Sequence, residues 1–244
     1  MSDNHDISRR NESFLMRSER RLLAFLVRRI PESVTSLQLS VLGLAGAVLA
    51  AGSLMASSIS KAFILPFALG VAVNWFGDSL DGTLARYRRQ ERPRFGFLVD
   101  HTLDLFSFIF LIVAFGLSPY LSLVSSLVIL LCYLLFSAYT YIRAATHHVH
   151  QMSYIGVGAT EFRILMVVWV CIGAVFGLRE PLIGRFSSLD IAIFVLAAIA
   201  VIGLGIKAVR DARQIASEEV QTRAVESLDV APPAKDVMAH NAPL

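Results

Sequence analysis

The stretch that decides the fold reads Asp78-Ser-Leu-Asp81-Gly82-Thr-Leu-Ala85-Arg86, then nine residues, then Gly96-Phe-Leu-Val-Asp100-His-Thr-Leu-Asp104. Its four aspartates stand at the edges of, or inside, long apolar segments. An ionised aspartate at the centre of a membrane helix costs about 2.5–3.5 kcal/mol on insertion scales, and four neighbouring carboxylates also repel one another. A compensating charge is therefore required, and a pair of divalent cations is the simplest one.

The composition around this stretch is that of an integral membrane protein. Of the 244 residues, 55% are hydrophobic and only 17% are charged, whereas soluble domains carry about 25% charged residues. Cys132 and Cys171 lie in apolar segments without other ligand residues nearby, so neither a disulfide nor a zinc site is expected. The polar, basic N-terminus does not have the pattern of a cleavable signal peptide.

Six transmembrane helices are expected, because a helix needs about 20 mostly apolar residues to cross a bilayer. The uncharged run 105–142 is too long for one helix, and Gly116-Leu-Ser-Pro119 divides it into two. The expected spans are residues 34–57, 62 to just beyond Asp81, about 95–116, about 119–142, about 160–178 and about 188–208. The fold class is therefore all-α integral membrane.

Three regions are expected along the chain. Residues 1–33 form an N-terminus whose segment 14–30 has apolar residues at helical spacing with arginines between them. This pattern predicts an N-terminal interfacial amphipathic helix in the headgroup plane. Residues 34–212 form the six-helix domain, and residues 213–244 form a polar, partly disordered tail that is expected to begin helical and end disordered.

Basic residues predict the orientation of these spans. They are concentrated in segments 9–29, 86–94 and 207–213, which all lie on one side of the membrane if there are six spans. Short cytoplasmic flanks are rich in Lys and Arg. Both termini and the aspartate motif are therefore expected to face the cytoplasm, and the chain is assigned to a bacterial inner membrane as a multi-pass protein.

Helical spacing brings the aspartates together. On one helix the positions i, i+3, i+4 and i+7 form a single stripe, which holds Asp78, Asp81, Gly82 and Ala85. On the next helix Asp100 and Asp104 share a face with Gly96, one turn before Asp100. Two antiparallel helices joined by a short loop can thus aim four carboxylates into one space, which the small residues leave open.

The residue types in this space suit phosphoryl transfer. Carboxylate oxygens are hard ligands for Mg²⁺, Mn²⁺ or Ca²⁺, and paired metals commonly clamp the attacking and leaving oxygens of that reaction. Arg86 follows directly, and its planar guanidinium matches phosphate oxygens in pairs. At the cytoplasmic surface, a water-soluble substrate can enter while a lipid tail stays in the membrane.

The motif Asp78-x-x-Asp81-Gly82-x-x-Ala85-Arg86 … Gly96-x-x-x-Asp100-x-x-x-Asp104 resembles the signature of the CDP-alcohol phosphatidyltransferases. Every signature position is matched, although the gap of nine residues between Arg86 and Gly96 is one longer than the usual spacing. The resemblance implies a six-helix membrane transferase of phospholipid biosynthesis, typically a homodimer. Such enzymes transfer a substituted phosphate from a CDP-linked donor to a hydroxyl acceptor and release CMP.

The resemblance also implies roles for the motif residues. Asp78, Asp81 and Asp100 would hold two divalent cations, Mg²⁺ or Mn²⁺. Asp104 would deprotonate the acceptor hydroxyl, which is a poor nucleophile until a carboxylate takes its proton, and it is counted among the metal ligands as well. Gly82, Ala85, Arg86 and Gly96 would bind the CDP moiety. The expected partners are donor, acceptor and membrane lipids, without nucleic acid.

The acceptor pocket has two interpretations. The cluster His147, His148 and His150 follows the fourth span, and the preferred interpretation is a solvated loop. The second interpretation places Arg143, His147 and Arg163 around the acceptor alcohol, because both flanking helices end on the cytoplasmic side.

The substrates stay open at this point. CDP-diacylglycerol with a polar alcohol is the expected pair, and the alternative is a choline/ethanolamine-type transferase that uses CDP-choline or CDP-ethanolamine with diacylglycerol. A hypothesis from another class is a cation-coupled transporter, which intramembrane aspartates could also serve. Against it, the acidic motif lies near one face of the membrane rather than at its midplane. An inert scaffold is disfavoured because all four aspartates are present.

Overall fold

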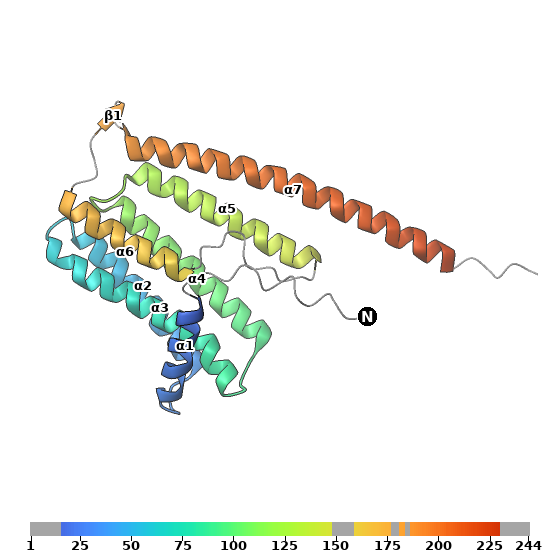
Figure 1. The fold of residues 1–244 in the computed structure, drawn as a ribbon, viewed down its shortest axis with the longest axis horizontal. Helices are drawn as coiled ribbons and strands as arrows, with labels where there is room; N and C mark the ends of the chain where they lie inside the picture. Colours follow the sequence, from blue (N-terminus) through green and yellow to red (C-terminus); the bar gives the residue numbers. More distant parts are fainter. Residues whose placement is uncertain (1–15, 148–158, 177–180, 184–185, 230–244) are drawn as a thin grey trace, which may run out of the picture. The chain divides into compact units, whose positions relative to one another are not determined.

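A computed structural model of the chain describes residues 16–147, 159–176, 181–183 and 186–229. These residues are almost entirely helical (Figure 1), which confirms the all-α class. The elements, in chain order, are α1 Met16–Leu26, η2 Val27–Arg29, α2 Ser36–Ala56, η3 Lys61–Phe63, α3 Ile64–Tyr87, α4 Pro93–Gly116, α5 Leu123–His147, α6 Ala159–Phe176, β1 Pro181–Ile183, β2 Phe186–Ser187 and α7 Ser188–Asp229. The chain divides inside α7 into two compact units, 1–197 and 198–244, and the helices that form the site belong to the first.

Within the described residues, five helices are long and apolar enough to cross a membrane. They are Ser36–Ala56, Lys61–Tyr87, Pro93–Gly116, Leu123–Arg143 and Ser188–Gln221. The chain is thus a multi-pass membrane protein by the length and composition of its helices. The expected fifth span coincides with α6, which has 18 residues and is not among these five. The count of six is therefore not confirmed and stays a prediction.

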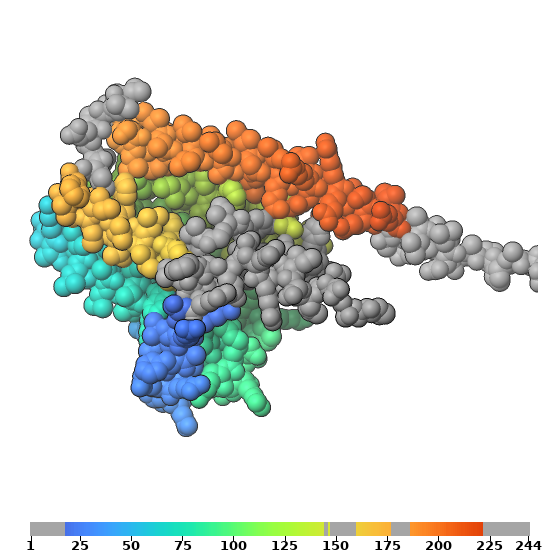
Figure 2. Space-filling view, in the orientation of Figure 1, coloured from blue at the N-terminus to red at the C-terminus, as the bar shows by residue number. Residues whose placement is uncertain are grey.

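The N-terminal segment forms α1 and the short η2. Leu23 and Val27 are buried against Leu39, Leu80 and Leu84 of α2 and α3. Figure 2 shows α1, in blue, at the surface of the first unit, where Leu22 and Phe25 of this helix are exposed. A helix is present in this segment, while its amphipathic character and its place in the headgroup plane remain predictions.

Helices α2 and α3 pack closely through glycines. A Cβ added at Gly46 would lie 2.5 Å from the backbone nitrogen of Asn74, and one added at Gly70 would lie 2.5 Å from that of Ala50. Gly43 and Gly77 face each other in the same way. Small residues let membrane helices approach to backbone contact, so α2 and α3 form a closely packed pair, which carries Ser40, Asp78 and Asp81.

The ends of α3 and α4 determine where the four aspartates lie along these helices. Helix α3 ends at Tyr87, and Arg89 has a φ of 55°, in the left-handed region that ends helices. Helix α4 begins at Pro93, a residue favoured in the first helical turn. It ends at Gly116 and α5 begins at Leu123, which confirms the expected break. Asp78 and Asp81 thus lie in the last three turns of α3, and Asp100 and Asp104 lie in the first half of α4.

The last helix continues past its expected span into the tail, whose beginning was expected to be helical. It continues beyond residue 208 to Asp229, because the polar residues that follow the apolar run are still good helix formers. The division of the chain at residues 33 and 212 stays a prediction.

Candidate active site

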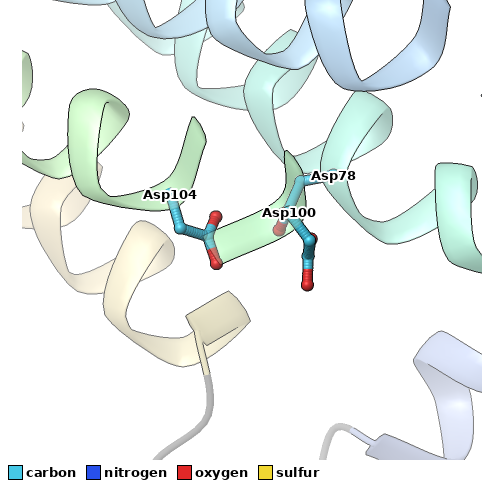
Figure 3. Close-up of side chains that lie close together, drawn as sticks. All are labelled: Asp78, Asp100 and Asp104. Carbon is cyan, nitrogen blue, oxygen red and sulfur yellow. The ribbon is translucent and has the colours of Figure 1, made fainter. Parts of the chain in front are cut away.

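Three aspartates from two helices meet at the centre of the site. One carboxylate oxygen of each of Asp78, Asp100 and Asp104 lies within 4.8 Å of the other two. Figure 3 shows Asp78 of α3 beside Asp100 and Asp104 of α4, with the side chains pointing into one space. The antiparallel pair of helices thus brings together carboxylates that the sequence separates by more than twenty residues.

All four aspartates of the motif line one small cavity. It has a volume of about 10 Å³, and its other lining residues include Ser40, Asn74 and Ser107. A space of this size holds about one water molecule or ion. Hard carboxylate oxygens around it suit a divalent cation, so the residues fit the metals that this kind of motif uses.

Asp81 differs from the other three aspartates. It is only 7% exposed, and its Oδ2 accepts a hydrogen bond of 2.5 Å from the Ser40 hydroxyl of α2. Its other oxygen accepts from the backbone N–H of Gly82. Buried carboxylates need such donors, and Ser40 therefore fixes the orientation of Asp81 at the cavity.

Arg163, which belongs to a third helix, α6, contacts the acidic cluster. Its Nη2 lies 2.7 Å from Asp78 Oδ2, and its Nε donates to Asn74 Oδ1 over 2.9 Å. Asn74 in turn donates to the Gly43 carbonyl of α2 over 3.0 Å. The guanidinium offsets part of the carboxylate charge and links α2, α3 and α6 at the level of the cluster.

A larger open pocket of about 950 Å³ adjoins the carboxylates. Its wall comes from the start of α2, the end of α3 and the start of α4, and it includes the four residues expected at a CDP moiety: Gly82, Ala85, Arg86 and Gly96. A Cβ added at Gly96 would meet nothing within 4 Å, and the three atoms nearest to one added at Gly82 belong to the Arg86 guanidinium, at 3.4–3.8 Å. The volume is in the range of small-molecule sites, so a nucleotide has room here.

Two arginines in this wall have different partners. Arg86 makes a long, exposed contact of 3.4 Å with the Thr83 hydroxyl. Arg88 donates to the backbone carbonyls of four residues before α2: Ile30, Pro31, Glu32 and Val34. Arg88 therefore holds the segment that leads into α2, and Arg86 is the better placed of the two for a phosphate.

Of the three acceptor-pocket residues, the structure places Arg163 at Asp78. Arg143 lies near the C-terminal end of α5. The side chain of His147 lies outside the described residues, as do His148 and His150.

Two tyrosines of α5, Tyr133 and Tyr141, pack against α4 and were not predicted from the sequence as candidate site residues. Tyr133 stacks on Phe108 of α4 with 3.6 Å between ring centroids and is hydrogen-bonded to Ser137. Tyr141 packs edge-on against His101 of α4 at 5.6 Å. Tyr133, Ser137 and Tyr141 follow one another at intervals of four, which is one helix face. This polar spacing inside an apolar run was the signal that could have revealed them.

Comparison with protein families gives one finding. The family model described as CDP-alcohol phosphatidyltransferase matches residues 29–205, which include the whole aspartate motif. No curated protein matches the chain.

Proposed function

Because the chain belongs to the CDP-alcohol phosphatidyltransferase family, we propose that it transfers the phosphatidyl group of CDP-diacylglycerol to the hydroxyl of a polar alcohol and releases CMP. The family implies an enzyme that uses a CDP-linked donor and an alcohol acceptor. CDP-diacylglycerol is preferred here over CDP-choline or CDP-ethanolamine on the sequence pattern. The choline/ethanolamine-type reaction is the alternative that the experiment below separates.

One observation carries the proposal: the carboxylates of Asp78, Asp100 and Asp104 converge, and Asp78 and Asp100 also line a pocket walled by Gly82, Gly96 and Arg86. A diphosphate next to the carboxylates and a nucleoside in the 950 Å³ pocket would fill the two spaces together. A transporter has no need of a nucleotide-sized pocket beside its cation site.

Asp78, Asp81, Asp100 and Asp104 would hold two divalent cations, Mg²⁺ or Mn²⁺. Members of this family use divalent metals. The four carboxylates line the small cavity, which has room for about one ion, and Asp78, Asp81 and Asp100 also line the adjoining larger pocket, where a second ion would have room. When bound, such cations offset the charge of the diphosphate and of the oxygens that attack and leave. The hydrogen bond from Ser40 orients Asp81 at the cavity, and Arg163 contacts one oxygen of Asp78, Oδ2.

Asp104 is proposed as the general base. Its carboxylate takes the proton of the acceptor hydroxyl, whose oxygen then forms a bond with the phosphorus that carries the diacylglycerol. The bond from that phosphorus to the oxygen bridging to CMP breaks, and CMP leaves with the electron pair. Arg86 binds phosphate oxygens of the donor, and the small residues Gly82, Ala85 and Gly96 let the nucleotide approach the helices.

The acceptor pocket remains a proposal with Arg143, His147 and Arg163. Arg163 is at the acidic cluster, where it can also meet the acceptor. Replacing Arg163 with Ala is expected to raise the KM of the acceptor while donor binding is kept. Acceptor kinetics that stay unchanged in this variant would remove Arg163 from the pocket.

The proposed setting is a bacterial inner membrane, with the site and both termini on the cytoplasmic side. This orientation is supported by the basic residues that flank the motif, because such residues stay in the cytoplasm. A homodimer is the expected assembly by family resemblance.

The experiment is a donor and acceptor panel with the purified full chain in detergent. One arm contains CDP-diacylglycerol, Mg²⁺ or Mn²⁺ and single polar alcohols, and the other contains CDP-choline or CDP-ethanolamine with diacylglycerol. CMP release in the first arm that depends on an added alcohol supports the proposal. Release only in the second arm identifies the alternative, and no release with any donor contradicts both.

A further inference from the structure

A carboxylate of α1 joins the site from outside its motif. Glu19 Oε1 accepts hydrogen bonds from Trp75 Nε1 over 2.8 Å, from the Ser79 hydroxyl over 3.3 Å and from the Thr160 hydroxyl over 2.7 Å. Trp75 and Ser79 belong to α3, and Thr160 belongs to α6. One oxygen atom thus connects three helices.

The donors to Glu19 stand directly beside the acidic cluster in the sequence. Ser79 follows Asp78, and Trp75 lies one turn before it. Thr160 lies three residues before Arg163, whose guanidinium contacts Asp78. The start of α6 is therefore linked to α3 at two points. Thr160 is linked to it through Glu19, and Arg163 contacts Asp78 directly.

The rest of α1 holds Glu19 in place. Leu23, one turn after Glu19, is buried together with Val27 against Leu80 and Leu84 of α3, and Trp75 packs on the same cluster. Arg88 fixes the segment after η2 through the carbonyls of residues 30–34. The helix is thus anchored through residues that follow the glutamate, which keeps the carboxylate at its three donors.

We propose that Glu19 is a positioning residue of the enzyme: it holds the first turn of α6 against α3, so that Arg163 stays at Asp78 and the acidic cluster keeps its geometry. The family match begins at residue 29, so the role lies outside the matched segment. The proposal rests on the proposed function for its catalytic readout. Hydrogen bonds to a carboxylate are the strong ones, and a small displacement of a positioned group lowers the rate of a transfer step.

The first test is a double-mutant cycle between Glu19 and Thr160, measured as CMP release with the full chain. Glu19→Ala is expected to lower kcat by about 10-fold with the KM of the donor near its wild-type value, since the displaced groups act on the reacting centre. Thr160→Val is expected to act in the same direction. The double variant should be no slower than Glu19→Ala, because interacting residues are not additive.

The control is Arg21→Ala, an exposed position of the same helix. It is expected to leave kcat unchanged. Glu19→Gln keeps an oxygen that can accept from Trp75 and Thr160, so it should recover a large part of the activity lost in Glu19→Ala. Independent, multiplying effects of Glu19→Ala and Thr160→Val, or a kcat of Glu19→Ala equal to that of the wild type, would overturn the proposal.

The second test does not depend on the reaction. The chain has two tryptophans, so a Trp169→Phe background leaves Trp75 as the only indole. Adding Glu19→Ala to it should shift the Trp75 emission, and adding Arg21→Ala should not. An unchanged emission would overturn the proposal even if activity falls. If the wild type releases no CMP from any donor, the proposed function fails, while this measurement still decides on the contact.

Discussion

Asp104 is the side chain that must accept a proton in the proposed reaction. It lies in the first half of α4 and shares its space with Asp78 and Asp100. Asp104→Asn has nearly the same shape and cannot act as a base, so kcat should fall by about 10²–10⁴-fold, the usual contribution of a general base. The measurement is CMP release at saturating donor and acceptor.

The matched control for this change is Asp211→Asn in α7. Asp211 pairs with Lys207 one turn away at 3.5 Å and is not among the residues that line the two pockets of the site, so its variant is expected to keep wild-type kcat. Activity of Asp104→Asn within a few-fold of the wild type would rule out a base at this position.

Ser40 acts through Asp81. Its hydroxyl is the side-chain donor to a nearly buried carboxylate, and Ser40→Ala removes this donor without adding bulk. Residues that orient metal ligands typically contribute about 10–100-fold in metal affinity or activity. The Mg²⁺ or Mn²⁺ concentration for half-maximal CMP release should rise by a factor in this range. Ser33→Ala, at an exposed position before α2, should leave that concentration unchanged, and an equal response of both variants would contradict the role of Ser40.

At the scale of elements, the contact between α2 and α3 depends on glycine. Gly46→Ala would bring a methyl group to 2.5 Å from the Asn74 nitrogen and 2.8 Å from the Gly70 carbonyl oxygen. Backbone atoms cannot yield as side chains do, so overpacking should destabilise the protein by about 1–3 kcal/mol. Because Asn74 holds Arg163, activity should fall as well. Thermal unfolding in detergent measures the first effect, and CMP release measures the second.

Gly52→Ala is the control on the same helix. A Cβ at Gly52 would meet nothing within 4 Å, and alanine is the better helix former by about 1 kcal/mol. Its unfolding temperature should equal or exceed that of the wild type. A loss as large as that of Gly46→Ala would show that helix packing is not the cause.

A second contact between elements lies far from the site. Asp190, near the start of α7, accepts hydrogen bonds of 2.5 Å from both Ser122 and Ser125, which lie just before and in the first turn of α5. It also accepts from the Ser187 N–H and hydroxyl, each over 2.9 Å. Ser187 Oγ accepts from the Asp190 N–H in return, which is the reciprocal arrangement of a capping box.

Asp190→Ala would leave these buried hydroxyls without their acceptor, which should destabilise the protein by about 1–3 kcal/mol. Asp190 contacts the start of α5, which follows the C-terminal end of α4 at Gly116. Asp104, the site carboxylate nearest to that end, lies 12 residues before Gly116, which is about 18 Å at 1.5 Å per residue. KM and kcat of the folded protein should therefore not change. Thermal unfolding and CMP release together check this prediction, and altered substrate kinetics in the stable fraction would contradict it.

At the scale of the whole molecule, the sequence predicted the parts that depend on local pattern. The break at Gly116-Leu-Ser-Pro119 and the helical class follow from apolar length and from Gly and Pro. The meeting of Asp78 with Asp100 and Asp104 followed from helical spacing and a short loop. These features need no knowledge of how the helices are rotated against one another.

Side-chain contacts between different helices could not be predicted from the sequence. Arg163 was expected near the acceptor and contacts Asp78, and Glu19 was not singled out although it binds three side chains. Such pairs depend on the rotation and depth of each helix, which spacing along one helix leaves open. Gly43 and Gly46 carried a usable signal, because small residues near one another in an apolar run indicate close helix packing.

The central claim is that the carboxylates shared by α3 and α4 bind divalent metal. The most direct measurement is a titration of the purified full chain with Mn²⁺ in the presence of CMP. Electron paramagnetic resonance reports the free Mn²⁺, and the bound Mn²⁺ is the difference from the total. The wild type is predicted to bind two ions, and the double variant Asp78→Asn/Asp100→Asn, checked for the same unfolding temperature, is predicted to lose this binding. Equal Mn²⁺ binding by both proteins, or no saturable binding by the wild type, would contradict the account.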